Sequence, residues 1–194
     1  YTSIAAEMGD ADLKALVEQI AAESLPVVED PGILSPRAFI DEVLHERFPN
    51  PAIPDTPQRI AADTSQKLPV RYGGTLRRYA RQSEQALAGL EFAPLVFAGW
   101  CRYLLGVDDR GNAMPVSPDP MLPQLQAHLK GIEVGRPDSL AGQLRPILSN
   151  AALFGVDLYA AGLGERTEEM FRDMLAGPGA VRATLHRNCV CKQP

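Results

Sequence analysis

The stretch "RIAADTSQKLP", Arg59 to Pro69, combines a helical pattern with charges of alternating sign. The three residues Asp-Thr-Pro that end at Pro57 supply a helix N-cap followed by proline at the first helical position. We therefore expect one helix from Pro57 to about Lys67, closed by Pro69. Side chains four residues apart share a helix face, so this helix would align Arg59, Asp63 and Lys67.

The aligned charges have two interpretations. In the first they form an exposed ladder of ion pairs, worth ~0.3–0.5 kcal/mol per pair and without a function. In the second, Arg59 and Lys67 point into a cleft and donate hydrogen bonds to the oxygens of a small polar ligand. Asp63 would then orient Arg59 or accept a hydrogen bond from a ligand hydroxyl. The spacing alone leaves both interpretations open.

Outside this stretch the apolar periodicity is helical, and no segment alternates with period two for long enough to predict a sheet. The chain of 194 residues should therefore be one all-α domain, residues 1–194. Another helix should start at Ser35 and Pro36, and its buried stripe should consist of Phe39, Ile40, Val43, Leu44 and Phe48. Further helices are expected at residues 10–25, 75–88, 92–106, 121–129, 139–144 and 166–175, and near the C-terminus. Trp100, Tyr103 and Leu104 should lie in the core.

Composition excludes several classes of function. A formal net charge of −5 argues against nucleic acid as a partner. The longest apolar run, "FAPLVFAGW" from Phe92 to Trp100, is about half of the ~18 residues that span a bilayer, so no membrane partner is expected. No export signal is visible, and three cysteines at spacings that suit neither disulfides nor zinc favour a cytoplasmic location without a metal.

Two long segments resemble a known family. "ERFPNPAIPDTPQRIAADTSQKLPVR", Glu46 to Arg71, is similar to the R-F-x-N-P-x-x-x-D-x-x-x-R-[IV]-x-x-D-x-S-Q-K-[IL]-P signature in the C-terminal domain of the polyol-specific long-chain dehydrogenases. "AGWCRYLLGVDDRGNAMPVSPDP", Ala98 to Pro120, resembles that family's A-x-W-x-R-Y-L-x-G-x-D-x-x-G segment. The family includes mannitol 2-dehydrogenase and the fructuronate and tagaturonate reductases, and the resemblance covers nearly the whole chain.

The resemblance implies parts that these residues lack. Family members bind NAD or NADP in an N-terminal Rossmann-like domain and hold a polyol, ketose or hexuronate against the helical C-terminal domain. Their catalytic lysine works without a metal, in a K-x-x-x-x-N-x-x-H helix that would precede Tyr1. The 194 residues are therefore expected to be the substrate-side part of an oxidoreductase that transfers hydride at C2, and to be inactive alone.

By position in the signature, Arg59 and Lys67 correspond to the arginine and lysine that contact substrate oxygens in the family. Asn50 and Asp63 are expected to support them, Asn50 as a turn residue and Asp63 as the partner of Arg59. Ser65 and Gln66 should hydrogen-bond backbone near the helix end. No residue in the sequence decides between mannitol and a hexuronate, or between NAD and NADP.

An alternative of another class is a non-enzymatic helical module for interaction or oligomerisation, with the charged stripe as its partner surface. The oligomeric state is not predictable from the sequence. As a fragment, the chain should expose the apolar face that docks against the missing part, so we expect self-association or weak solubility.

Overall fold

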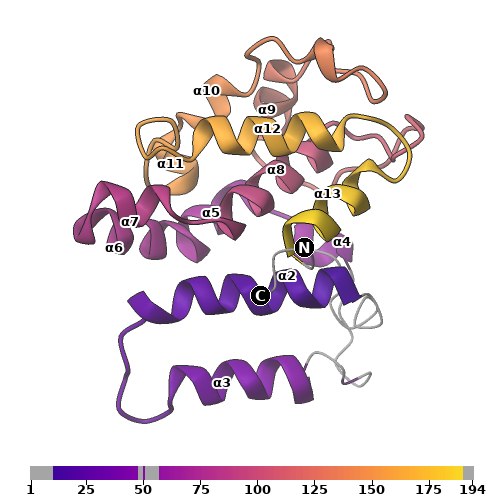
Figure 1. Cartoon of the computed structure of the whole chain (residues 1–194). Helices are drawn as coiled ribbons and strands as arrows, with labels where there is room; N and C mark the ends of the chain where they lie inside the picture. Colours follow the sequence, from indigo (N-terminus) through magenta and orange to yellow (C-terminus); the bar gives the residue numbers. More distant parts are fainter. Residues whose placement is uncertain (1–10, 48–49, 51–56, 190–194) are drawn as a thin grey trace.

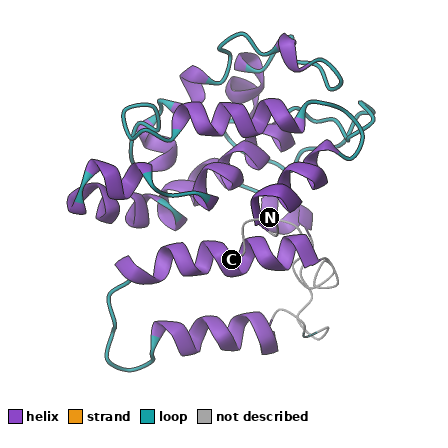
Figure 2. Ribbon diagram, in the orientation of Figure 1, coloured by secondary structure: helices purple, strands orange, loops and turns teal. Residues whose placement is uncertain are grey.

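A computed structural model describes residues 11–47, 50 and 57–189 of the chain. Within these residues the structure is helical, and the β-structure is confined to two isolated bridges, Val107 with Ala113 and Glu133 with Arg136 (Figure 2). The prediction of an all-α domain is confirmed. No helix in the described part combines the length and apolar character needed to cross a bilayer.

The helices are numbered along the chain as in Figure 1. Their bounds are α2 Ala11–Ser24, η1 Leu25–Val27, α3 Pro36–Glu42, η2 Val43–Arg47, α4 Pro57–Ala61, α5 Thr64–Arg71, α6 Gly73–Gln82, α7 Glu84–Ala88, α8 Phe92–Leu104, α9 Leu122–His128, η3 Pro137–Ser139, α10 Arg145–Leu148, α11 Ala151–Phe154, α12 Gly164–Met174 and α13 Ala180–Cys189.

The core is built around α8, which lies between α12 and the lower helices in Figure 1. Almost every side chain of α8 is buried, as expected for a helix that is apolar on all sides. In α12 the buried residues Thr167, Met170, Phe171 and Met174 follow the spacing of a single helical face. That face packs along α8, and this pair makes the most extensive contact between any two helices described.

Aromatic rings join α8 to the segments on either side of it. Phe97 lies 4.8 Å from Phe154 and 5.3 Å from Tyr72, measured between ring centroids, and both pairs are edge-on. Trp100 meets Phe154 at 5.9 Å. Each such pair contributes about 0.5–1.5 kcal/mol beyond the area that it buries. Trp100 and Leu104 are core residues as predicted, whereas Tyr103 is only half-buried.

The N-terminal helix α2 is tied to the start of α8 by one carboxylate. Glu23 accepts hydrogen bonds from the backbone N–H groups of Glu91, Phe92 and Ala93, at 2.5, 2.9 and 3.0 Å. These N–H groups belong to the first turn of α8, where no intrahelical acceptor exists. Burial raises the pKa of the Glu23 carboxyl, while the three N–H groups act in the opposite direction. Glu23 therefore caps α8 from a distance in sequence.

Helix α2 contributes Ala15 and Leu16 to the main core, and Figure 1 shows α3 on the far side of α2 from the other helices. The predicted start of α3 at Ser35 and Pro36 is confirmed. Its predicted buried stripe is wrong in part, because Leu44 is buried but Phe39 is 41% exposed. Ile33, in the turn before α3, is 94% exposed. Phe48 lies outside the described residues.

Three predicted helices differ from the structure. The segment 75–88 forms two helices, α6 and α7, because Ser83 is extended and caps α7 through its side chain. Of the segment 139–144, Ser139 ends η3 and residues 141–144 form bends and turns, with Gly142 at φ 88°, where glycine is favoured. The third difference, the helix expected from Pro57 to Lys67, affects the candidate site and is described with it.

The Glu23 cap predicts a loss of stability. Glu23→Ala leaves three helix N–H groups without their acceptor, so we expect the free energy of unfolding to fall by about 2 kcal/mol. Glu23→Gln keeps one acceptor oxygen and should lose less. Denaturant unfolding measures both, with Glu169→Ala on the exposed face of α12 as the control. Equal stability of Glu23→Ala and Glu169→Ala would contradict the cap.

Candidate functional site

The signature stretch bends at Asp63, so the prediction of one helix from Pro57 to Lys67 is wrong. Helix α4 ends at Ala61 and α5 starts at Thr64. Between them Asp63 adopts the left-handed conformation, with φ 52° and ψ 35°, which aspartate tolerates better than most residues. Its backbone N–H donates to the Pro118 carbonyl at 2.9 Å. Arg59 and Lys67 therefore lie on two different helices rather than on one face.

The first turn of α5 is capped by a residue from a distant loop. Asp119 accepts from the Ser65 backbone N–H at 2.7 Å and from the Ser65 hydroxyl at 2.6 Å. The prediction that Ser65 bonds backbone is wrong for its side chain, which donates to this carboxylate. Asp63, the residue before α5, makes no side-chain cap of its own. A carboxylate at a helix N-terminus also favours the helix through its dipole.

The Lys67 side chain extends from α5 across the bend to α4. Its ammonium donates to the Ile60 carbonyl at 3.1 Å, and its side chain is half-buried. Thr64 also bridges the two helices, since its hydroxyl donates to the Ala61 carbonyl at 2.5 Å. Pro69, expected to end the helix, lies inside α5, which continues to Arg71. We call the region formed by residues 59–67 the α4–α5 corner.

The corner holds Arg59, Asp63 and Lys67, whereas Asn50 precedes it in the chain. Arg59 is exposed on α4, and the structure brings Lys67 to the helix that carries it. Asp63 is exposed at the bend. Asn50 is also exposed, and its backbone N–H donates to the Arg47 carbonyl at 3.3 Å, a contact typical of a turn residue. The roles of Arg59 and Lys67 as substrate contacts and of Asp63 as partner of Arg59 stay predictions.

The second signature segment forms the end of α8 and the loop that reaches the corner. The Tyr103 hydroxyl on α8 accepts from the Ser117 backbone N–H at 2.7 Å and lies 3.0 Å from the Ser117 hydroxyl oxygen. Ser117 directly precedes Pro118 and Asp119, the two residues that contact the corner. The two segments that resemble the family signature therefore meet in space.

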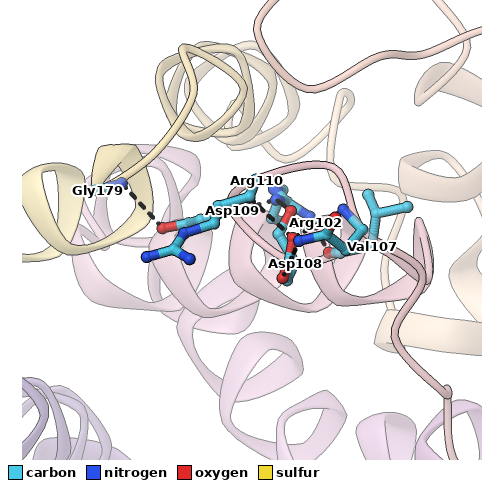
Figure 3. A network of polar contacts seen from close by, with 7 residues as sticks. Arg102, Val107, Asp108, Asp109, Arg110 and Gly179 are labelled. Carbon is cyan, nitrogen blue, oxygen red and sulfur yellow. Dashed lines mark hydrogen bonds and ion pairs between the residues drawn. The ribbon is translucent and has the colours of Figure 1, made fainter.

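The opposite end of this loop is held by Arg102 (Figure 3). Its guanidinium is buried and donates to the Val107 carbonyl at 2.8 Å and the Asp108 carbonyl at 2.9 Å. It also lies 3.5 Å from the Asp109 carboxylate, whose other oxygen accepts from the Gly179 N–H at 3.1 Å. Burial lowers the pKa of Arg102, and the neighbouring carboxylates oppose that shift. Arg102 thus links α8 to the loop before α13.

Asp108 orders the turn itself. Its carboxylate accepts from the Asn112 side chain at 3.0 Å, the Asn112 N–H at 2.9 Å and the Arg110 N–H at 2.8 Å. These contacts, the Asn112 side chain foremost, lower the pKa of Asp108. The arginine and the aspartate of the matched W-x-R-Y-L-x-G-x-D-x-x-G pattern, Arg102 and Asp108, therefore stabilise the loop after α8 in this chain.

Sequence reasoning assigned no role to Asp119 or to the hydroxyl of Tyr103. The available signal was their position, because Tyr103 stands inside the second matched segment and Asp119 at its end.

Among the described residues, no group of three or more His, Cys, Asp and Glu side chains is placed to hold a metal ion. Cys101 is a free, buried thiol, the Cys189 side chain is also buried, and Cys191 lies outside the described residues.

A cavity of about 180 Å³ lies between α2 and α3 and is separate from the corner. Its lining includes the ionisable side chains of Glu18, Arg37, Asp41 and His45, and none of the predicted substrate contacts.

Comparison with known proteins points to one family. The family described as mannitol dehydrogenase C-terminal domain matches residues 1–170. A D-mannonate oxidoreductase of Thermotoga maritima is 52% identical over 185 residues, which cover 95% of this chain and 34% of that protein. A mannitol 2-dehydrogenase of Emericella nidulans is 38% identical over 75% of this chain and 26% of its own length. A D-mannonate oxidoreductase of Escherichia coli is 31% identical over 75% of this chain and 27% of its own length. The chain thus spans about a third or less of these relatives.

The buried guanidinium of Arg102 predicts a large effect of its removal. Arg102→Met leaves the Val107 and Asp108 carbonyls without donors, so we expect a loss of about 3 kcal/mol in unfolding free energy. Arg110→Met, in the same loop but exposed, is the control and should change stability by less than about 0.5 kcal/mol. Thermal and denaturant unfolding measure both. Similar midpoints for the two variants would show that Arg102 does not hold the loop.

Proposed function

The chain belongs to the mannitol dehydrogenase C-terminal domain family, and from this premise we propose that it is the substrate-side domain of a longer NAD(P)-dependent oxidoreductase. The proposed reaction interconverts a secondary alcohol of a sugar alcohol or aldonate with the C2 ketone of a ketose or keto-hexuronate. NAD or NADP would carry the hydride. The described residues form no strand followed by a glycine-rich turn and helix, so they do not fit a dinucleotide site. We assign that site, and the catalytic lysine, to other parts of the parent protein.

The observation that carries the proposal is the α4–α5 corner. The bend at Asp63 and the hydrogen bond from Lys67 to Ile60 bring an ammonium group to the helix that bears Arg59. A lysine ammonium has three N–H donors, and Ile60 takes one of them among the described contacts. Arginine adds a planar, permanently charged fork. Together they provide the several donors that are needed to hold a flexible, oxygen-rich chain in one orientation.

We propose an acidic sugar such as D-mannonate as the first substrate to test. The relative that is 52% identical carries that name, whereas the named mannitol 2-dehydrogenase is 38% identical. The chemistry of the corner supports the same choice, because a carboxylate can accept two parallel hydrogen bonds from arginine. Mannitol offers hydroxyls alone and would gain less from two cationic side chains.

A second candidate function rests on the α2–α3 hairpin. Ile33 is 94% exposed, and Val28, Leu34 and Phe39 are each more than 40% exposed. Clustered apolar exposure of this kind is typical of a surface that meets another protein. This observation favours an interaction or oligomerisation module, which is compatible with the enzyme proposal if the surface meets another part of the parent.

Kinetics of the parent protein test the substrate contacts. Arg59→Ala and Lys67→Ala should each lower kcat/KM for D-mannonate by more than about tenfold, ~1.4 kcal/mol of transition-state stabilisation, because each variant lacks one charged hydrogen-bond donor to the substrate. The exposed residues Arg81 and Lys130 provide matched controls as Arg81→Ala and Lys130→Ala. The assay supplies NAD or NADP with D-mannonate and, separately, mannitol.

Two results would count against this proposal. Full activity in both Arg59→Ala and Lys67→Ala would return these charges to an exposed surface without a role. A parent that turns over mannitol but not D-mannonate would leave the enzyme class intact and remove the argument from the carboxylate.

The exposed hairpin predicts self-association of the 194-residue chain on its own. We expect sedimentation to give a mass above that of the monomer, which is 21.0 kDa. Ile33→Asp combined with Phe39→Asp should restore the monomer, because charges oppose apolar contact. Val70→Asp, at a 79% exposed apolar residue on α5, is the control and should not. A monomer for the unmodified chain would reject the second candidate function.

A further inference from the structure

Asp119 has contacts that neither the sequence nor the proposed function accounts for. It is half-buried and lies in the loop that follows α8. One carboxylate oxygen accepts from the Ser65 hydroxyl at 2.6 Å and the Met121 N–H at 2.8 Å, and the other accepts from the Ser65 N–H at 2.7 Å. These donors come from α5 and from the loop itself. The carboxylate therefore fastens the loop to the first turn of α5.

The turn that Asp119 holds is the one that carries Lys67. The backbone N–H of Lys67 donates to the Asp63 carbonyl at 3.0 Å, so Lys67 belongs to the same first turn as Ser65. Its long side chain extends from that turn to the Ile60 carbonyl on α4. A small rotation of the turn about the helix axis would move the ammonium by more than it moves the backbone. Displacements of about 1 Å in a binding group cost as much as 100-fold in rate.

The loop that supplies Asp119 is itself anchored in the core helix. Tyr103 on α8 holds Ser117 through its hydroxyl, and Pro118 accepts from the N–H of Asp63 at the bend. Pro118 and Asp119, which are consecutive in this anchored loop, thus accept hydrogen bonds from adjacent parts of the α4–α5 corner. The bend itself offers no side-chain cap to replace them.

We propose that Asp119 is a positioning residue that sets the place of Lys67, and through it the binding of substrate. The inference rests on the proposed function in which Lys67 contacts the substrate. Asp119 acts through α5, because both of its oxygens already accept hydrogen bonds from Ser65 and Met121.

The test uses the full-length parent with D-mannonate as substrate. Asp119→Ala should raise KM about tenfold with a smaller change in kcat, because the lost orientation affects a group that binds the substrate before and during the reaction. Asp119→Asn keeps one acceptor oxygen and should recover part of the loss. Asp108→Asn is the control, since Asp108 also accepts three hydrogen bonds in the same loop but none from the corner. It should lower the unfolding temperature and leave KM within about twofold.

A second readout does not depend on activity. Acetylation of lysine amines, followed by mass spectrometry, reports how firmly each ammonium is held. Lys67 is half-buried and bonded to Ile60, so it should react more slowly than the exposed Lys130. Asp119→Ala should raise the rate at Lys67 severalfold without changing the rate at Lys130, and Asp108→Asn should change neither.

The outcomes separate the two proposals. An unchanged KM in folded Asp119→Ala overturns the inference, whether or not Lys67 becomes more reactive. A parent that turns over no polyol or aldonate refutes the proposed function and with it the link to substrate. In that case the acetylation rate still decides whether Asp119 holds Lys67, and an unchanged rate overturns that as well.

Discussion

The bend at Asp63 leaves backbone N–H groups at the start of α5 that need hydrogen-bond acceptors, and the surrounding structure is arranged to supply them. A helix that begins abruptly leaves its first N–H groups without acceptors, and α5 begins directly after a left-handed residue whose own side chain does not cap it. The carboxylate of Asp119 meets that demand from another part of the chain. Because the same carboxylate also holds the Met121 N–H, the α4–α5 corner and the loop after α8 are ordered together.

That coupling explains how two matched segments with different tasks form one unit. The segment around Arg59 and Lys67 forms the bend and carries the two cations that we propose as substrate contacts. The segment from Ala98 to Pro120 supplies support: Arg102 fixes the carbonyls of the loop, and Tyr103 holds Ser117 next to the corner. The buried face of α8 provides the rigid base for both. The geometry of the corner therefore depends on contacts with α8 and with the loop that follows it.

The sequence was sufficient for the helical class and for the long helices, because the apolar residues of α2 and α12 recur at helical spacing and α8 is one continuous apolar run. It failed where a single backbone conformation decides the path. The pattern from Pro57 to Lys67 is helical throughout, and local spacing gives no sign that Pro118 accepts from a left-handed residue in its middle or that Asp119 caps the helix after it. Ser65 was misjudged for the same reason, since its partner is not local. Phe39 was assigned to a buried stripe because periodicity indicates a face but not whether another element covers it.

The sequence separation between Ser65 and Asp119 also bears on the order of folding. Their hydrogen bonds join residues that are 54 positions apart, and closing a loop of that length carries an entropic penalty that local helix formation does not. The hydrogen bonds inside α4 and α5 join residues close in sequence, yet the angle between the two helices is not defined until the loop after α8 is in place. The corner therefore acquires its native geometry only once residues 118 and 119 are in place. A nascent chain that has completed α5 but not residue 119 would carry Lys67 and Arg59 without a fixed relation between them.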